Sequence, residues 1–272
     1  MQVISITEFK KIIWQYYAAN GRLFDWRGVD DPYKVFISEV MLQQTQTARV
    51  AIKYPQFIAQ FPDFNGLAQA PLKDVLLAWQ GMGYNRRGMY LHRAAQTIMQ
   101  NYAGILPNDP ILLDALPGIG AATASSICAF AFNAPTIFIE TNIRAVFIHF
   151  FFQGKENVHD KELLPLIEAA VDKDNPREWY YALMDYGVLL KKTLINPSRK
   201  SAHHAKQSKF EGSDRQIRGM ILKILTNSDQ RVSQDKILQL IGVDPERILK
   251  IIEQLIHEQF IKKDTFGISI YG

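Results

Sequence analysis

Apolar residues recur at helical spacing along most of this chain. Residues 9–17 place five large apolar side chains on one helical face, and Ser5 and Glu8 have the spacing of a capping box before it. No stretch before residue 200 alternates in the manner of a strand, which predicts an all-α body. A second helix is expected from Pro32. Further helices are expected over residues 46–61, 71–80, 86–102, 108–115 (with Asn108 as its cap), 121–132, 141–152, 159–172 and 176–190.

The pattern changes towards the C-terminus. Residues 191–212 carry six Lys/Arg, two His and few apolar side chains, which indicates a basic linker, either solvated or in contact with phosphate. From Ser213, three amphipathic helices precede an alternating stretch with a turn, and Asp244 and Pro245 have the types expected at the start of the third. This order resembles a winged helix-turn-helix. We therefore predict three segments: 1–190, 191–212 and 213–272.

Composition narrows the class of protein without defining it. A hydrophobic content of 47% is sufficient for a packed core, and no apolar run is long enough to span a membrane. The start of the chain lacks the pattern of an export signal. Cys128 is the one cysteine, which excludes an internal disulfide and favours the cytoplasm. The net charge of +4 and the isoelectric point near 9.0 are compatible with a polyanionic partner.

Two glycines flank one isoleucine in "LPGIG", residues 116–120, directly before an apolar helix. Gly118 and Gly120 can adopt φ values that other residues resist, and they let a turn approach another surface closely. The amides at the start of the following helix then favour an anion such as a DNA phosphate. The alternative is an ordinary tight corner between two helices.

Two glutamates are the candidate acids. Glu39 follows the apolar run "YKVFI", so its carboxyl could keep a proton near neutral pH; a solvated helix face is the alternative. Glu140 ends a second apolar run, where it either caps the next helix or stabilises a developing cation. Residues 43–46 are four consecutive polar, uncharged side chains, a composition suited to a loop that hydrogen-bonds to base edges or fills a base stack.

Five motifs occur in the order of a known superfamily. They are "WR" (26–27), "PYKVFISEVMLQQTQ" (32–46), "GMGYNRRGMYLHRAA" (81–95), "LPGIGAATA" (116–124) and "ALMDYG" (182–187). Over about residues 5–190 the chain resembles the helix-hairpin-helix DNA glycosylases, and within them the adenine DNA glycosylases of the MutY type. The resemblance implies two helical lobes, with the target base of a double-stranded DNA flipped into the cleft between them.

The resemblance also implies roles for individual residues. Glu39 matches the general acid that protonates the departing adenine, and Glu140 stands where the family has the aspartate that stabilises the oxocarbenium-like sugar. The positions that match the base pocket are Trp26, Arg27, Leu42 and Asn142. The residues for which we expect contact with DNA are Gln43, Gln44, Thr45, Tyr84, Arg86, Gly118, Gly120 and Arg144.

The chain departs from the family at several positions. Ala122 replaces the lysine that forms a Schiff base in relatives that also cleave the strand, so we expect no lyase activity. Glu140 is one methylene longer than aspartate, which moves the carboxylate by more than about 1 Å. The four places of the family's iron–sulfur ligands fall on Lys191, Ser198, Ser201 and Gln207. None is a thiol, so no cluster is expected; an alkali-metal ion at the hairpin stays an open alternative.

These observations favour a monofunctional DNA glycosylase of base excision repair. It would remove adenine opposite 8-oxoguanine or guanine by base flipping and acid-catalysed hydrolysis, as a monomer in the cytoplasm, associated with the nucleoid. The family's usual Nudix-like domain is replaced by the short tail, which bears on whether 8-oxoguanine is recognised. The alternatives are a glycosylase for thymine or uracil opposite guanine, and a DNA-binding protein without catalytic activity.

Overall fold

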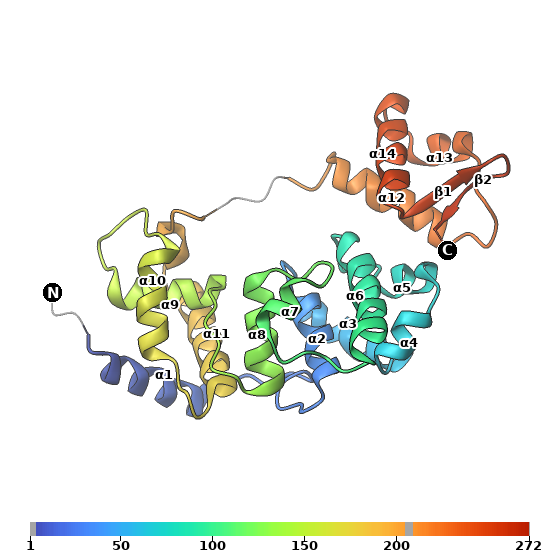
Figure 1. The fold of residues 1–272 in the computed structure, drawn as a ribbon. Coiled ribbons are helices and arrows are strands. Elements are labelled where there is room, and N and C mark those ends of the chain that lie inside the picture. Colours follow the sequence, from blue (N-terminus) through green and yellow to red (C-terminus); the bar gives the residue numbers. More distant parts are fainter. Residues whose placement is uncertain (1–3, 205–208, 272) are drawn as a thin grey trace. The chain divides into compact units, whose positions relative to one another are not determined.

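The chain is mostly helical. The computed structural model describes residues 4–204 and 209–271, and in these residues the only strands form one two-stranded hairpin (Figure 1). The prediction of an all-α body is confirmed. The contacts divide the chain into two compact units, one from residues 1–39 and 107–206 and the other from residues 40–106 and 207–272. This division differs from the three predicted segments, because each unit combines stretches that are distant in sequence.

The first unit is a set of helices around an aromatic core. Its helices are α1 (Ile6–Asn20), the start of α2 (Pro32–Leu42), α7 (Pro110–Asp114), α8 (Ala121–Phe132), α9 (Thr141–Phe151), α10 (Asp160–Ala170), α11 (Pro176–Thr193) and the 3₁₀ turn η1 (Pro197–Lys200). Phe9 of α1 is fully buried, and its ring centroid lies 5.1 Å from that of Phe147 and 5.9 Å from that of Trp179. These ring contacts join α1, α9 and α11, and α11 packs against both of the other helices.

The second unit combines the middle of the chain with its tail. Its elements after the end of α2 are α3 (Thr47–Gln60), α4 (Phe64–Gln69), α5 (Leu72–Ala78), α6 (Arg86–Tyr102), α12 (Asp214–Thr226), α13 (Gln234–Ile241), α14 (Pro245–His257), β1 (Ile261–Asp264) and β2 (Gly267–Ile270). The two strands pair antiparallel, with Ile261 opposite Ile270. Three helices followed by a β-hairpin match the expected winged-helix-like order.

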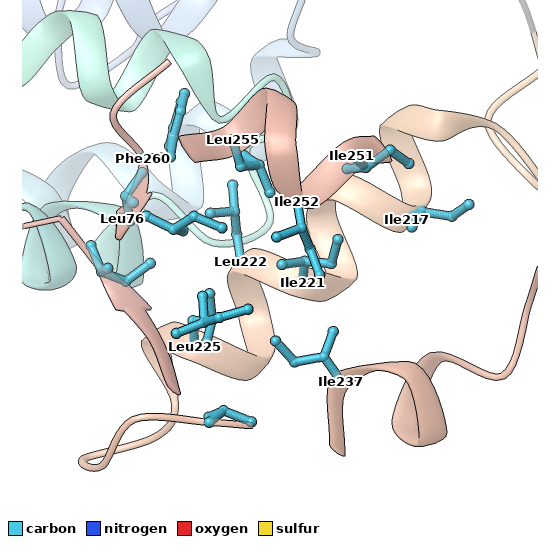
Figure 2. Packing of buried hydrophobic residues seen from close by; sticks show 14 of the residues in the cluster. Leu76, Ile217, Ile221, Leu222, Leu225, Ile237, Ile251, Ile252, Leu255 and Phe260 are labelled. Atoms are coloured by element: carbon cyan, nitrogen blue, oxygen red, sulfur yellow. The ribbon is translucent and has the colours of Figure 1, made fainter. Parts of the chain in front are cut away.

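The core of the tail also includes residues from the middle of the chain. Leu72 and Leu76 of α5 and Met89 of α6 belong to the same buried cluster as the apolar faces of α12 and α14. Figure 2 shows Leu76 in this cluster with Leu222 and the other labelled side chains. Burial of a Leu or Met side chain contributes about 1.5–3 kcal/mol, so these shared contacts bind the tail firmly to the middle of the chain.

Polar contacts reinforce the same junction. The carboxylate of Glu258 accepts hydrogen bonds from both Arg86 of α6 and Arg218 of α12. Lys73 of α5 donates to the carbonyl of Ser228 at 2.8 Å and pairs with Asp229. Residues 213–272 therefore belong to the same compact unit as residues 40–106.

Local signals explain most helix boundaries, with three differences from the sequence-based prediction. The cap of α7 is Asp109, whose side chain accepts from the amide of Ile111, and not Asn108. α4 was not predicted; Asp63 caps it by accepting from the amide of Gly66 at 2.7 Å. α11 extends to Thr193, so the first residues of the predicted basic linker are helical. Among the described residues, no helix combines the length and apolarity that crossing a bilayer requires.

Candidate active site

Glu39 lies in the last half of α2 with its carboxyl directed at α8. The hydroxyl of Ser126 donates to Oε2 of Glu39 at 2.6 Å. Although the residue keeps some accessible surface, protein atoms surround the carboxyl densely enough that desolvation is the largest effect on its pKa, which rises to about 7. The negative charge of Glu140 raises this pKa further, while the Ser126 hydrogen bond and Arg27 lower it. Glu39 can therefore carry a transferable proton at neutral pH.

Glu140 is the N-cap of α9. Its Oε1 accepts from the amides of Asn142 and Ile143 at 2.7 and 2.9 Å, and its Oε2 accepts from the side-chain amide of Asn142 at 3.1 Å. The sequence offered capping and a catalytic role as alternatives, and the structure shows the cap. The two are compatible, because the positive end of the helix dipole favours a carboxylate anion at this point.

The two acids lie within electrostatic reach of each other, since the charge of Glu140 contributes to the raised pKa of Glu39. Their surroundings differ in kind. Glu39 is enclosed and has one hydroxyl donor, whereas Glu140 faces three N–H donors at a helix start. A buried carboxyl beside a second carboxyl that is held by amide donors at a helix start is an arrangement suited to one proton donor and one stabilising anion.

A lysine fixes the orientation of Asn142. Lys191 Nζ donates to Oδ1 of Asn142 at 2.7 Å. Because an ammonium group can only donate, the amide oxygen must face Lys191 and the amide nitrogen must face Glu140. Burial lowers the pKa of Lys191, and the charge of Glu140 opposes this shift. The contact requires Gly187, where an added Cβ would lie 2.6 Å from Cβ of Asn142.

Arg27 is held by a buried aspartate. Two nitrogens of its guanidinium donate to the Asp185 carboxylate at 2.9 and 2.8 Å, and the group lies 4.4 Å from the centroid of the Tyr181 ring. Burial alone would raise the pKa of Asp185, but hydrogen bonds from Arg27 and Arg22 outweigh it, so the pKa lies below its ordinary value. Arg27 is thus a fixed positive charge that acts on Glu39.

The "LPGIG" turn lies between α7 and α8. Gly118 has φ of 77°, a conformation that strongly favours glycine. Gly120 has φ of −109°, so the expectation of unusual backbone there was wrong; it is instead the N-cap of α8, with no side-chain capping bond and open space where a Cβ would project. Two helices joined by a glycine turn form a helix-hairpin-helix.

Comparison with known proteins agrees with this geometry. Residues 37–168, which contain both acids and the hairpin, match the HhH-GPD superfamily of base excision DNA repair proteins. Over these residues the chain belongs to the helix-hairpin-helix DNA glycosylase superfamily.

The chain is also similar in sequence to individual adenine DNA glycosylases. It is 33% identical over 183 residues to the adenine DNA glycosylase of Buchnera aphidicola subsp. Baizongia pistaciae, a match that covers 67% of this chain and 52% of that one. It is 28% identical over 283 residues to that of Mycolicibacterium smegmatis, covering 97% and 95%. The chain thus spans about half the length of the first relative and nearly all of the second.

Solved structures support the fold. A thermostable thymine-DNA glycosylase superposes with a TM-score of 0.60 at 23% identity, covering 68% of this chain and 86% of that one. Endonuclease III in a non-covalent DNA complex superposes with a TM-score of 0.57 at 16% identity, covering 67% and 86%. At these identities the comparison shows the fold alone.

An iron–sulfur cluster does not fit the residues of this glycosylase-family chain. Of the four places assigned to its ligands, Lys191 is bound to Asn142, Ser198 donates to Asn196 at 2.8 Å, and Ser201 pairs with Val158; Gln207 lies outside the described residues. Amine and hydroxyl groups are not the thiolate ligands that such clusters use. The segment is instead held by η1 and by the bonds of Val158, whose amide donates to Lys200 and whose carbonyl accepts from Ala202, both at 2.9 Å.

Two loops of the second unit carry strained backbone. Gln44 has φ of 53° and Tyr84 has φ of 46°, values that are uncommon outside glycine and that cost about 1–3 kcal/mol each. Both are among the residues expected to contact DNA, and both line one groove. Such strain persists where the surrounding structure enforces it, and Arg87 does so here by donating to Thr45 Oγ1 at 2.8 Å and to the carbonyl of Met82 at 3.1 Å.

The other residues predicted to line the base pocket or contact DNA differ in burial and in their partners. Trp26 is buried and stacks on Phe24 at 4.6 Å, so it belongs to the first unit's interior. Arg144 forms a two-point ion pair with Asp160, and Arg86 pairs with Glu258. Both arginines are thus engaged in ion pairs within the protein, and their contact with DNA stays a prediction. Leu42 and Gln43 lie in the second unit and are partly exposed.

Sequence reasoning missed three residues of the site. Asp185 could have been found, because a carboxylate amid the apolar face of "YYALMDYGVLL" must be buried with a partner. Ser126 and Lys191 gave no such signal, since their roles depend on contacts across 87 and 49 positions of sequence.

Proposed function

We propose that the protein is a monofunctional DNA glycosylase that removes adenine from mispairs in double-stranded DNA. The observation that carries the proposal is the pair of carboxyls: Glu39, with a pKa of about 7, beside Glu140, held by amide donors at the start of α9. Adenine is a poor leaving group until a ring nitrogen is protonated, and Glu39 is suited to supply that proton. The adenine glycosylases among its relatives support this choice of base.

The steps follow from the two acids. The flipped adenine accepts the proton of Glu39, the bond between C1′ and N9 breaks, and its electron pair leaves with the base. The Glu140 carboxylate stabilises the positive charge that develops on the sugar. Water then adds to C1′ and releases a proton, which leaves free adenine and an abasic site. Acid catalysis of this kind contributes about 10²–10⁴-fold.

Strand cleavage is not part of the proposed reaction. The residue at the second position after Gly120 is Ala122, which has no amine to attack C1′. We therefore propose that the abasic site is left intact and that the strand breaks only on later treatment with alkali.

The test is excision from duplexes with A:8-oxoguanine, A:G, T:G or U:G pairs, each followed by alkali. We expect cleavage at adenine that requires alkali, and its loss in Glu39→Gln with DNA affinity retained. Cleavage at thymine or uracil, tight binding without any cleavage, or full activity of Glu39→Gln would each contradict the proposal.

A further inference from the structure

Ser126 holds one of the two oxygens of the Glu39 carboxyl. Its hydroxyl lies 2.6 Å from Oε2 of Glu39, and the serine itself is buried. Oε1 has no hydrogen-bond partner within residues 4–204 and 209–271. It is nevertheless not enclosed, since the buried side-chain atoms without a partner in those residues belong to Arg87, Arg177 and Trp179. The two oxygens therefore differ: Oε2 is anchored against α8, and Oε1 is open.

The same hydroxyl has a second acceptor. The carbonyl of Thr123, about one turn earlier in α8, lies 3.0 Å from Oγ of Ser126. A hydroxyl has one hydrogen, and it can accept as well as donate. If Glu39 carries its proton on Oε2, that O–H donates to Ser126, and Ser126 donates to Thr123. If Oε2 carries no proton, Ser126 donates to Oε2.

A hydroxyl is suited to an acid that must hold a proton and then lose it. A group that can only donate, such as an ammonium, stabilises the carboxylate and depletes the acid form. The hydroxyl satisfies Oε2 in both protonation states, because its hydrogen can turn from the Thr123 carbonyl to Glu39. The separation of 2.6 Å lies in the range of about 2.5–2.7 Å that is typical of a hydroxyl donating to a carboxylate.

The other charged and titratable groups around Glu39 come from different elements. Arg27, in the loop before α2, lowers the pKa of Glu39, and Glu140 at the start of α9 raises it. The phenol of Tyr181 on α11 is close enough for the charge of Glu39 to raise the pKa of the phenol. Of the effects that lower the pKa of Glu39, the hydrogen bond from Ser126 is the largest. Ser126 is thus the group that most favours release of the proton.

We propose that Ser126 assigns different tasks to the two oxygens of Glu39. It donates to Oε2, so the acid proton resides on Oε1, the open oxygen, from which it passes to a ring nitrogen of the extruded base. The electron pair of the broken O–H bond stays on the carboxylate, and the Ser126 hydrogen bond strengthens as this charge develops. Ser126 is a positioning residue, because it acts on the base only through Glu39. The inference rests on the proposed function, since it takes Glu39 as the general acid.

The position of the proton can be read from the C=O vibration of Glu39 without DNA. Infrared difference spectra of the full chain between pH 6 and pH 8.5 should contain this band, because ordinary carboxyls are ionised at both values. Its loss in Glu39→Gln assigns the band. We expect Ser126→Ala to move it to higher frequency, since its C=O group loses a hydrogen-bond donor. A band that does not move would place the proton on Oε2 or exclude the contact, and would overturn the proposal.

Single-turnover excision of adenine over the same pH range tests the effect on the reaction. In Ser126→Ala the developing carboxylate loses its donor, so the rate at pH 6 should fall about tenfold. The descending limb of the pH–rate profile should move to higher pH, a change that loss of packing alone does not produce. Ser125→Ala is the matched control: this neighbouring serine of α8 forms no side-chain hydrogen bond within the described part of the chain, so wild-type behaviour is expected in both measurements.

The outcomes separate this inference from the proposed function. If the wild type excises adenine but Ser126→Ala keeps the wild-type band or the wild-type descending limb, the role of Ser126 is refuted and the proposed reaction stands. If the wild type excises no adenine and Ser126→Ala still shifts the band, the placement of the proton on Oε1 is supported and the proposed reaction fails.

Discussion

Replacement of Glu39 by glutamine should stabilise the protein at alkaline pH while it abolishes adenine release. The pKa of Glu39 is about 7 in the folded protein against an ordinary value of 4.5. Between these values the folded state binds more protons than the unfolded state, so this residue lowers stability as pH rises. Glutamine has nearly the same shape and does not titrate, so the variant lacks this loss.

The size of the effect follows from the shift. At 1.36 kcal/mol for each pKa unit, the stability difference between Glu39→Gln and wild type should increase by about 2–3 kcal/mol from pH 5 to pH 8.5. This figure is an upper estimate, because the residue keeps some accessible surface. The substitution also alters the hydrogen bond with Ser126. Any contribution of that change that is equal at pH 5 and pH 8.5 cancels when the two pH values are compared.

The assay is urea unfolding of both proteins at pH 5 and pH 8.5, followed by circular dichroism. Glu168→Gln is the matched control, since Glu168 is an exposed carboxyl of the same unit. A difference between Glu39→Gln and wild type that is equal at the two pH values would show that burial does not hold the proton on Glu39, and the acid role would fall with it.

Three further variants probe the site. Ser126→Ala removes a hydrogen bond that lowers the pKa of Glu39, so the fall in excision rate with rising pH should move about one unit higher; an unchanged pH profile would exclude the contact. Glu140→Gln keeps the cap geometry but removes the negative charge, and single-turnover excision should fall about 10²–10³-fold with DNA affinity retained; a rate near wild type would assign Glu140 to the fold alone. Lys191→Met frees the amide of Asn142 and should reduce the single-turnover rate about tenfold, while Lys192→Met, at an exposed neighbour, should have no effect; equal rates would remove Lys191 from the site.

Local signals made much of the helical framework predictable. Ser5, Ser213 and Asp244 each accept from a backbone amide at a helix start, as their residue types and positions indicate. α4 escaped notice because it has only six residues and contains Gly66, which weakens the periodic signal; the cap at Asp63 was the usable clue. A capping bond depends on residues two or three positions apart, so sequence alone can specify it.

The division into units could not be predicted in the same way. The amphipathic faces of α5 and α12 each indicate a buried side but not the partner that covers it. The same limit applies to Lys191, which reads as the first residue of a basic linker and proves to be the last turn of α11 in contact with Asn142. The candidate acids were predictable from motif order, whereas the groups that set their protonation were not.

The shared core of the second unit has a consequence for the order in which the chain can fold. Residues 40–106 emerge from the ribosome more than a hundred residues before residues 207–272, which cover Leu72, Leu76 and Met89. Until the tail arrives, this early stretch must keep an apolar surface exposed, while α8 to α11 can already assemble with α1. We therefore expect the second unit to be the later one to form and the point at which a stalled or shortened chain becomes prone to aggregation.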